Sequence, residues 1–205
     1  QRYFSDPMAW LAVWDGGMSF HGGFLGVLLA VVIWSRFNPK TRFWEVTDLL
    51  AISAPIGLFF GRIANFINGE LYGRPTDVPW AMRFPTFGPN GVRDQWTEPR
   101  HPSQLYESFL EGLVLLIVLN VMWRNPAIRD RAGIVTGGFM AGYGFFRFLV
   151  EFVRKPDNGI EAGFFKFAGL GTFTTGQELS FPMIIAGVAL MLWRRNQTPS
   201  GTPAP

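Results

Sequence analysis

The sequence contains no cysteine and only two histidines, His21 and His101. Disulfides, thiolate metal sites and a cysteine nucleophile are therefore excluded. A zinc site built mainly from imidazoles is also disfavoured, because the chain has too few of them.

Charged residues are scarce as well. They make up 16% of the 205 residues, whereas a typical soluble domain carries about 25%. Hydrophobic residues make up 48% and aromatic residues 16%, so lipid is expected to surround much of the chain. The net charge of +3 does not indicate nucleic acid. Membrane proteins collect Lys and Arg in their cytoplasmic loops, and no basic tract here is interleaved with aromatics.

Five apolar stretches are long enough to span a membrane, which takes about 20 helical residues. The third and the fifth are the clearest, with "LVLLIVLNVMW" and "FPMIIAGVALMLW". We therefore expect an all-α membrane protein with about five transmembrane helices. They are predicted at residues 18–35, 47–68, 104–123, 133–152 and 177–193.

The connections between these stretches predict the orientation of the chain. "RFNPKTR", "RNPAIRDR" and "WRRN" are short and basic, which is typical of cytoplasmic loops. Residues 69–103, here called the head segment, are rich in Pro and Gly and mixed in charge, as expected of a large extracytoplasmic loop between the second and third helices. We expect a single polytopic domain over residues 1–195 and a disordered cytoplasmic tail over residues 196–205.

Polar side chains within the spans are predicted to gather in the outer leaflet. The inner ends, with "VLLAVVIW" and "LLIVLNVMW", carry almost nothing ionisable. Polar groups at membrane depth are costly and usually face one another or a site. The group comprises His21, Arg62, Asn65, Asn68, Gln104, Glu107, Glu111, Tyr143, Arg147, Glu151, Arg154, Gln177 and Glu178.

Helical spacing supports this grouping. Tyr143, Arg147, Glu151 and Arg154 follow one stripe of a helix. Gln104, Glu107 and Glu111 likewise share one face. A cluster with more than one arginine suits an anionic group, because guanidinium matches phosphate in a bidentate way. In the outer leaflet the obvious anion is a phospholipid head group.

Structural roles remain open for each residue taken alone. Arg147 and Glu151 could form an ion pair that locks helices together, and Arg154 could extend to the interface. His21 could be a hydrogen-bonded packing residue. Gly138 and Gly142 form a G-x-x-x-G pattern, which predicts close helix packing without any chemistry.

Four blocks of the sequence resemble a known family, in the same order. "GRIANFINGELYGR" closely matches the signature of the prolipoprotein diacylglyceryl transferases, which begin bacterial lipoprotein maturation. "WDGGMSFHGG", "RHPSQLYE" and "GYGFFRFLVEFVRKPD" resemble three further blocks. The family's usual fold has seven transmembrane helices, so the resemblance implies that the two N-terminal ones are missing from this chain.

The resemblance implies a transferase without metal or cofactor. It would move the diacylglyceryl group of phosphatidylglycerol to the lipobox cysteine of a prolipoprotein signal peptide, form a thioether and release glycerol phosphate. Its place would be the bacterial cytoplasmic (inner) membrane, with the active site toward the outer leaflet. Phosphatidylglycerol, the prolipoprotein and membrane lipid are the expected partners, and nucleic acid is not.

The family's roles carry over to matching positions. His21, Arg62, Arg147 and Glu151 would be catalytic, with His21 as the general base, Arg62 on the lipid phosphate and Glu151 holding Arg147. Alternatively, nearby arginines alone could lower the pKa of the substrate thiol enough. His101 and Gln104 could contact substrate at the entrance or cap the third helix. The residues expected to bind substrate are Arg62, Asn65, Asn68, Glu70, Gly73, Gln104, Tyr143 and Arg154.

A second hypothesis remains, that of a non-catalytic membrane protein which binds lipid or transports an anion. A transporter requires a polar path that reaches the cytoplasmic side. The apolar inner ends of the spans argue against one.

Overall fold

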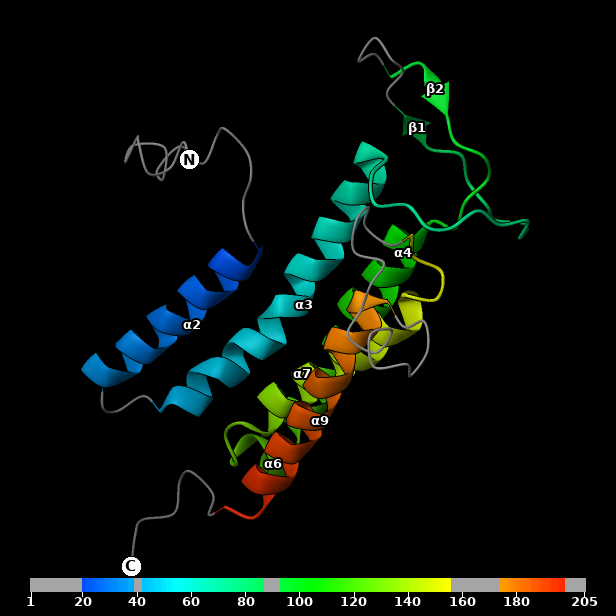
Figure 1. Cartoon of the computed structure of the whole chain (residues 1–205). Coiled ribbons are helices and arrows are strands. Elements are labelled where there is room, and N and C mark those ends of the chain that lie inside the picture. Colours follow the sequence, from blue (N-terminus) through cyan, green and yellow to red (C-terminus); the bar gives the residue numbers. More distant parts are fainter. Residues whose placement is uncertain (1–19, 39–41, 87–92, 156–173, 198–205) are drawn as a thin grey trace, which may run out of the picture. The chain divides into compact units, whose positions relative to one another are not determined.

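Helices account for most of the residues that the computed structural model describes, which are 20–38, 42–86, 93–155 and 174–197 (Figure 1). The chain divides into two compact units, Gln1–Val46 and Thr47–Pro205. The predominance of helices among the described residues confirms the expectation of an all-helical fold. The predicted tail lies outside the described residues from residue 198 onward, and the single-domain organisation stays a prediction.

The described part of the first unit is dominated by one apolar helix, α2 (Phe20–Phe37). Its large side chains are widely exposed, Leu25 at 61% and Leu29 at 60%, and Val31 is the one buried side chain among those described in this helix. Exposed apolar surface on this scale indicates contact with lipid or protein rather than water. The helix runs two residues beyond the predicted end at residue 35.

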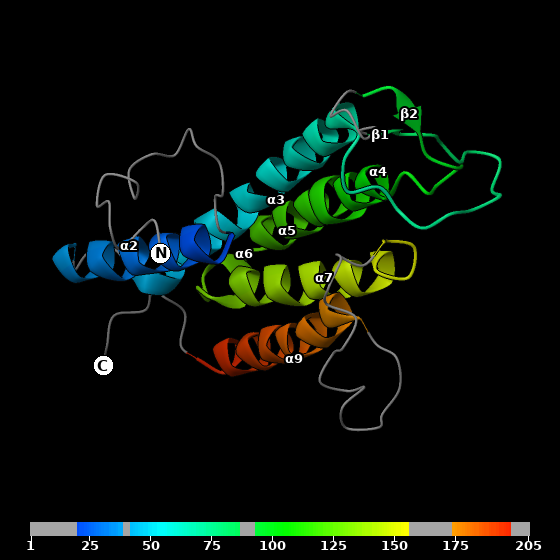
Figure 2. The ribbon, with the colours of Figure 1, turned by 45° about the horizontal axis from the view of Figure 1, so that its top comes forward.

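The second unit is a helical bundle with a small head. In this unit α4, η3 and α5 form one continuous helix, in which η3 is a wider, π-helical stretch. Figure 2 shows α5, α7 and α9 side by side in that order. The helices are α3 (Phe43–Asn68), α4 (Ser103–Glu107), η3 (Ser108–Val114), α5 (Leu115–Arg124), α6 (Pro126–Arg129), α7 (Ile134–Val150) and α9 (Thr175–Arg195).

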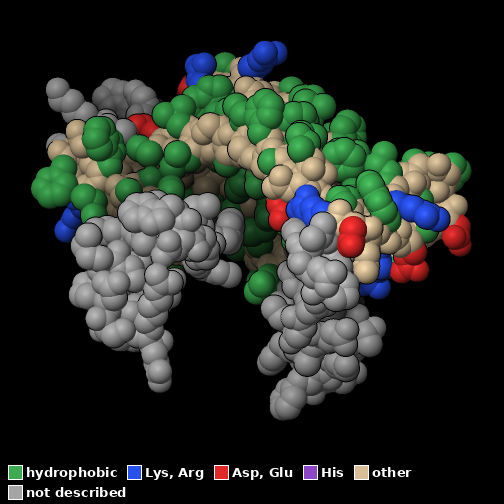
Figure 3. Space-filling view, turned by 90° about the horizontal axis from the view of Figure 1, so that it is seen from above, with side chains coloured by type: hydrophobic (Ala, Val, Ile, Leu, Met, Phe, Trp, Pro, Cys, Tyr) green, Lys and Arg blue, Asp and Glu red, His purple; other side chains and the backbone are tan. Residues whose placement is uncertain are grey.

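Within the described residues, three helices are long and apolar enough to cross a membrane. They cover Phe43–Asn68, Ser103–Arg124 and Gly176–Arg195, while Leu25–Phe37 and Ile134–Val150 form shorter apolar helices. Hydrophobic side chains cover much of the described surface in the view of Figure 3, and charged ones are confined to a few places. The structure thus supports a membrane protein with helical spans.

Close packing in the second unit depends on small residues of α7 and α9. A Cβ on Gly187 would lie 2.5 Å from the backbone nitrogen of Ala141 and 2.6 Å from the carbonyl oxygen of Gly137. Only glycine permits this approach of two backbones. The predicted Gly138 and Gly142 instead face the side chains of Met122 and Leu115 on α5, so that pattern packs helices together without backbone contact.

A buried carboxylate fixes the start of α7. Asp48 of α3 is fully buried, and its Oδ2 accepts a 2.7 Å hydrogen bond from the nitrogen of Gly133. Its Oδ1 accepts from the nitrogen and the hydroxyl of Thr136. The carboxylate thus satisfies helix N-terminal donors that have no intrahelical partner. This buried acid lies near the start of α3, whereas Arg62 lies near its end, and it was not among the polar side chains that the sequence analysis grouped together.

The head segment forms extended structure between α3 and α4. Strand β1 (Pro85–Thr86) pairs antiparallel with β2 (Gln95–Trp96), with Pro85 opposite Trp96. Isolated bridges join Pro75 to Arg100 and Met82 to Arg100. These pairings hold the two ends of the head segment together above the bundle.

Candidate active site

Arg62 and Glu107 form the closest ion pair among the described residues of the bundle. Arg62 lies in the last two turns of α3, and its Nε is 2.7 Å from Oε2 of Glu107 at the end of α4. Glu107 is fully buried, whereas the Arg62 side chain keeps 19% exposure. A charge removed from water needs such a partner, because its lost hydration is otherwise not replaced.

Arg147 joins the same carboxylate from α7. Its Nη1 donates to Oε2 of Glu107 at 3.2 Å, so two guanidinium groups share one oxygen. Its Nη2 lies 3.4 Å from Oε2 of Glu151, one turn further along. The structure therefore contains the predicted ion pair between Arg147 and Glu151.

Arg154 completes the cluster from beyond the helix. Helix α7 ends at Val150 and Glu151 is its C-terminal cap. Arg154 instead forms an antiparallel bridge with Gly73, so the expected single helical stripe was wrong for this residue. Its Nη1 still lies 3.8 Å from Oε2 of Glu151, and its Nε lies 3.8 Å from Oε1 of Glu107.

A third glutamate, Glu111, lies deeper in the bundle on η3. It is fully buried, and the nearest guanidinium nitrogens, on Arg62 and Arg147, are each 4.0 Å away. We call the six side chains that meet here the arginine–glutamate cluster. Its members are Arg62, Arg147, Arg154, Glu107, Glu111 and Glu151.

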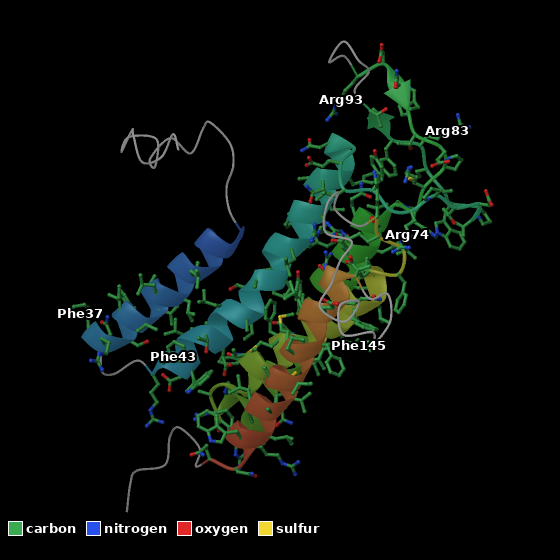
Figure 4. The ribbon with its side chains drawn as sticks, in the orientation of Figure 1. Phe37, Phe43, Arg74, Arg83, Arg93 and Phe145 are labelled. Atoms are coloured by element: carbon green, nitrogen blue, oxygen red, sulfur yellow. The ribbon has the colours of Figure 1, made fainter. Side chains whose placement is uncertain are left out.

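The head segment is joined to this cluster by backbone contacts. The Arg74 nitrogen donates to the carbonyl of Val153 at 2.9 Å, and the side-chain Nε of Arg74 (labelled in Figure 4) donates to the carbonyl of Arg154 at 2.9 Å. A Cβ on Gly73 would lie 2.5 Å from the carbonyl oxygen of Val153. Glycine is thus required here because two backbone segments approach too closely for any side chain.

The two asparagines of the signature block face Glu70. The side-chain amides of Asn65 and Asn68 donate to Oε1 of Glu70, at 2.9 Å and 3.2 Å. These hydrogen bonds, Asn65's first, lower the pKa of the Glu70 carboxyl. Gln104 is fully buried and donates from Nε2 to the Glu70 carbonyl at 2.6 Å. Hydrogen bonds of the signature block therefore connect the end of α3 to the start of α4.

Tyr143 and His21 were also predicted as site residues, and they belong to different units. Tyr143 is half-buried, packs against the core of Ala51, Leu115, Leu119 and Val135, and stacks on Phe139. His21 lies on α2, in the first unit, and its side chain is outside the described residues.

His101 and Gln177, by contrast, have local partners. Nδ1 of His101 is 3.3 Å from the hydroxyl of Tyr106, which also accepts a 2.6 Å hydrogen bond from Nε1 of Trp80. His101 therefore does not cap α4 through its side chain. The side chain of Gln177 accepts from the nitrogen of Thr174 in a capping box that begins α9.

The centre of the cluster was missing from the sequence-based site. Glu107 and Glu111 were placed on a polar helix face but not among the candidate site residues. Their spacing in an otherwise apolar helix was the available signal. It could not show that Glu107 binds two arginines from different helices, 45 residues before it and 40 after it.

Comparison with known proteins identifies the family. The family model described as prolipoprotein diacylglyceryl transferase matches residues 2–193. A phosphatidylglycerol–prolipoprotein diacylglyceryl transferase of Photobacterium profundum is 49% identical over 201 residues, which cover 96% of this chain and 67% of that protein.

Two further relatives carry the same name. The Azospirillum brasilense protein is 52% identical over 95% of this chain and 68% of its own length. The Vibrio vulnificus protein is 52% identical over 93% of this chain and 64% of its own length. The chain thus spans about two thirds of the length of these relatives, and it belongs to the prolipoprotein diacylglyceryl transferase family.

Proposed function

We propose that this chain transfers the diacylglyceryl group of phosphatidylglycerol to the lipobox cysteine of a prolipoprotein. The cysteine sulfur attacks the glyceryl carbon that carries the phosphate ester. A carbon–sulfur bond forms, the carbon–oxygen bond breaks, and glycerol phosphate leaves with the bonding electrons. The thiol proton passes to a base. Family membership and the three clustered guanidinium groups support this function.

The arginine–glutamate cluster suits the leaving group. Negative charge grows on the departing phosphate oxygen, and fixed cations that are already oriented stabilise it without further reorganisation. Arg62 and Arg147 keep 19% and 15% of their side chains exposed, whereas Glu107 is fully buried. The two arginine side chains are therefore not fully covered by the described residues. Glu107 and Glu151 orient them from behind.

We infer that the signature block shapes the head-group site. Asn65, Asn68 and Glu70 form one hydrogen-bonded group at the end of α3. Gly73 allows the head segment to pack against the residues that follow α7. Arg154 pairs with Gly73 there and adds its guanidinium group to the proposed site. Gln104 holds the start of α4 to the same group, and Tyr143 lines the helix face below Arg147.

The proton acceptor has two candidates. His21 would act as a general base toward the thiol, because imidazole titrates close to neutral pH. Alternatively, the arginines could lower the thiol pKa enough for a thiolate to form without a base.

We also propose five membrane-spanning helices in the bacterial inner membrane, with the cluster toward the outer leaflet. The basic connections around α6 and after α9 support this orientation. An anion transporter would require a polar path to the other end. Asp48 is a buried acid near the start of α3, but both of its carboxylate oxygens accept hydrogen bonds from the start of α7. The neighbouring core of Leu115, Leu119 and Val135 is apolar. This arrangement favours the transferase.

The test is a transfer assay with the chain in vesicles that contain phosphatidylglycerol and a lipobox peptide. Arg62→Ala should abolish transfer, and Arg62→Lys should restore little, since an ammonium lacks the bidentate fork. Loss of Arg62 leaves Glu107 with fewer partners, at a cost of about 3–5 kcal/mol, so insertion and folding are checked for each variant.

Arg129→Ala is the matched control, because Arg129 is half-exposed and pairs only with neighbouring Asp130 among the described residues. It should transfer at the normal rate. Full transfer by folded Arg62→Ala would end the assignment of Arg62 to the lipid phosphate.

A further inference from the structure

The arginine–glutamate cluster contains equal numbers of acids and bases. If every member were ionised, the three guanidinium charges would be cancelled by three carboxylates. A cluster without net charge offers little long-range attraction to an anion. The protonation state of the three glutamates therefore decides whether this cluster can hold a lipid phosphate.

The three glutamates are stabilised unequally. Glu107 has guanidinium nitrogens at 2.7 Å and 3.2 Å, and Glu151 has them at 3.4 Å and 3.8 Å. Glu111 has none nearer than 4.0 Å. Among the described residues, neither of its side-chain oxygens has a hydrogen-bond partner, although the side chain is fully buried.

Asp48 shows how this bundle surrounds a buried carboxyl group with hydrogen-bond donors. It is equally buried, and it accepts hydrogen bonds from two backbone nitrogens and one hydroxyl. Glu111 accepts no hydrogen bond from any described residue, and Glu107 lies one helical turn away with a charge of the same sign. An ionised carboxylate in that position loses its hydration, and guanidinium nitrogens no nearer than 4.0 Å compensate for little of that loss, so binding a proton is the less costly state.

We propose that Glu111 is a neutral carboxylic acid in the resting protein, so that the cluster carries one net positive charge, which a lipid phosphate neutralises. The lipid part rests on the proposed function, whereas the proton on Glu111 does not. The charged and titratable groups that face Glu111 are Glu107 from α4, Arg62 from α3, Tyr143 and Arg147 from α7, and Arg154 beyond α7.

Infrared difference spectroscopy tests the proton directly. The full chain is placed in phosphatidylcholine nanodiscs, so that the result does not depend on catalysis. The carbonyl stretch of a protonated carboxylic acid should be present in the unaltered chain and lost in Glu111→Gln. Asp48→Asn is the matched control and should retain the band. A band that survives Glu111→Gln unchanged, or no band in the unaltered chain, would overturn the proposal.

Carbodiimide labelling tests the same point without a variant that could misfold. A hydrophobic carbodiimide reacts with protonated carboxyl groups in apolar surroundings, and mass spectrometry locates the adduct. We expect labelling of Glu111 in preference to Glu107 and Glu151. Preferential labelling of either of the other two glutamates would contradict the assignment.

Lipid binding tests the charge. In vesicles of phosphatidylglycerol and phosphatidylcholine, the affinity of the chain for phosphatidylglycerol should fall about tenfold as rising pH ionises Glu111. Glu111→Gln should not show this fall, because the amide cannot ionise. If the infrared band behaves as expected but the two proteins show the same pH dependence of lipid affinity, the lipid part of the proposal fails and the proton on Glu111 stands.

Discussion

One oxygen of Glu107 lies within 3.2 Å of guanidinium nitrogens from two helices, Nε of Arg62 on α3 and Nη1 of Arg147 on α7. Both arginines are oriented by this shared contact. Glu151 fixes the other side of Arg147. At the scale of single residues, the proposed phosphate site therefore depends on the buried carboxylates that orient the arginines as well as on the arginines that would touch the lipid.

Glu151 in turn depends on a residue with no side chain. Gly176, in the first turn of α9, lies against the Glu151 carboxylate, and an added Cβ would be 2.7 Å from its Cδ and Oε2. Gly176→Ala should displace that carboxylate and so misplace Arg147. We expect the transfer rate to fall roughly tenfold to a hundredfold, with a smaller change in the apparent affinity for lipid.

The rate is measured per folded molecule in the same vesicle assay. Gly57→Ala is the control, because a Cβ on that α3 glycine meets nothing within 4 Å. Equal rates for the two variants would show that Gly176 does not position Glu151.

Helix α7 is held at both of its ends by residues distant in sequence. Asp48 caps its start, and the bridge of Gly73 with Arg154 holds the residues that follow its end. Such contacts fix how far α7 can slide along its neighbours. At the scale of elements, they place Arg147 opposite Glu107.

Asp48→Asn should destabilise the protein, because an amide group would replace one of the two oxygens that accept backbone hydrogen bonds. We expect a loss of about 1–3 kcal/mol, the usual cost of an unsatisfied buried donor. Thermal unfolding in detergent measures it. Asp130→Asn is the matched control, since Asp130 is exposed and its ion pair with Arg129 is worth little. A shift in unfolding temperature no larger than that of the control would count against the cap.

The helices themselves were predictable, and their ends were less so. Apolar runs placed each of the five within a few residues of its observed position. The fourth ends at Val150 rather than at 152, because the chain turns there to bridge with Gly73. A contact between residues so far apart leaves no local mark in the sequence.

At the scale of the whole molecule, the absence of cysteine makes the orientation directly testable. A single cysteine can be introduced at Glu98 in the head segment or at Arg129 in α6 without any background. A membrane-impermeant maleimide should label Glu98→Cys in intact cells and Arg129→Cys only after the membrane is permeabilised. Labelling of Arg129→Cys from outside would contradict the orientation inferred from the basic loops.

The sequence alone determined the class of protein, the helices and the family. These depend on composition, on runs of neighbouring residues and on a contiguous signature, "GRIANFINGELYGR". Only the tertiary structure decided which acids meet which arginines. It made Glu107 the centre of the cluster, left Glu111 poorly paired and bound Asp48 to α7, because each of these outcomes depends on distances between side chains on different helices.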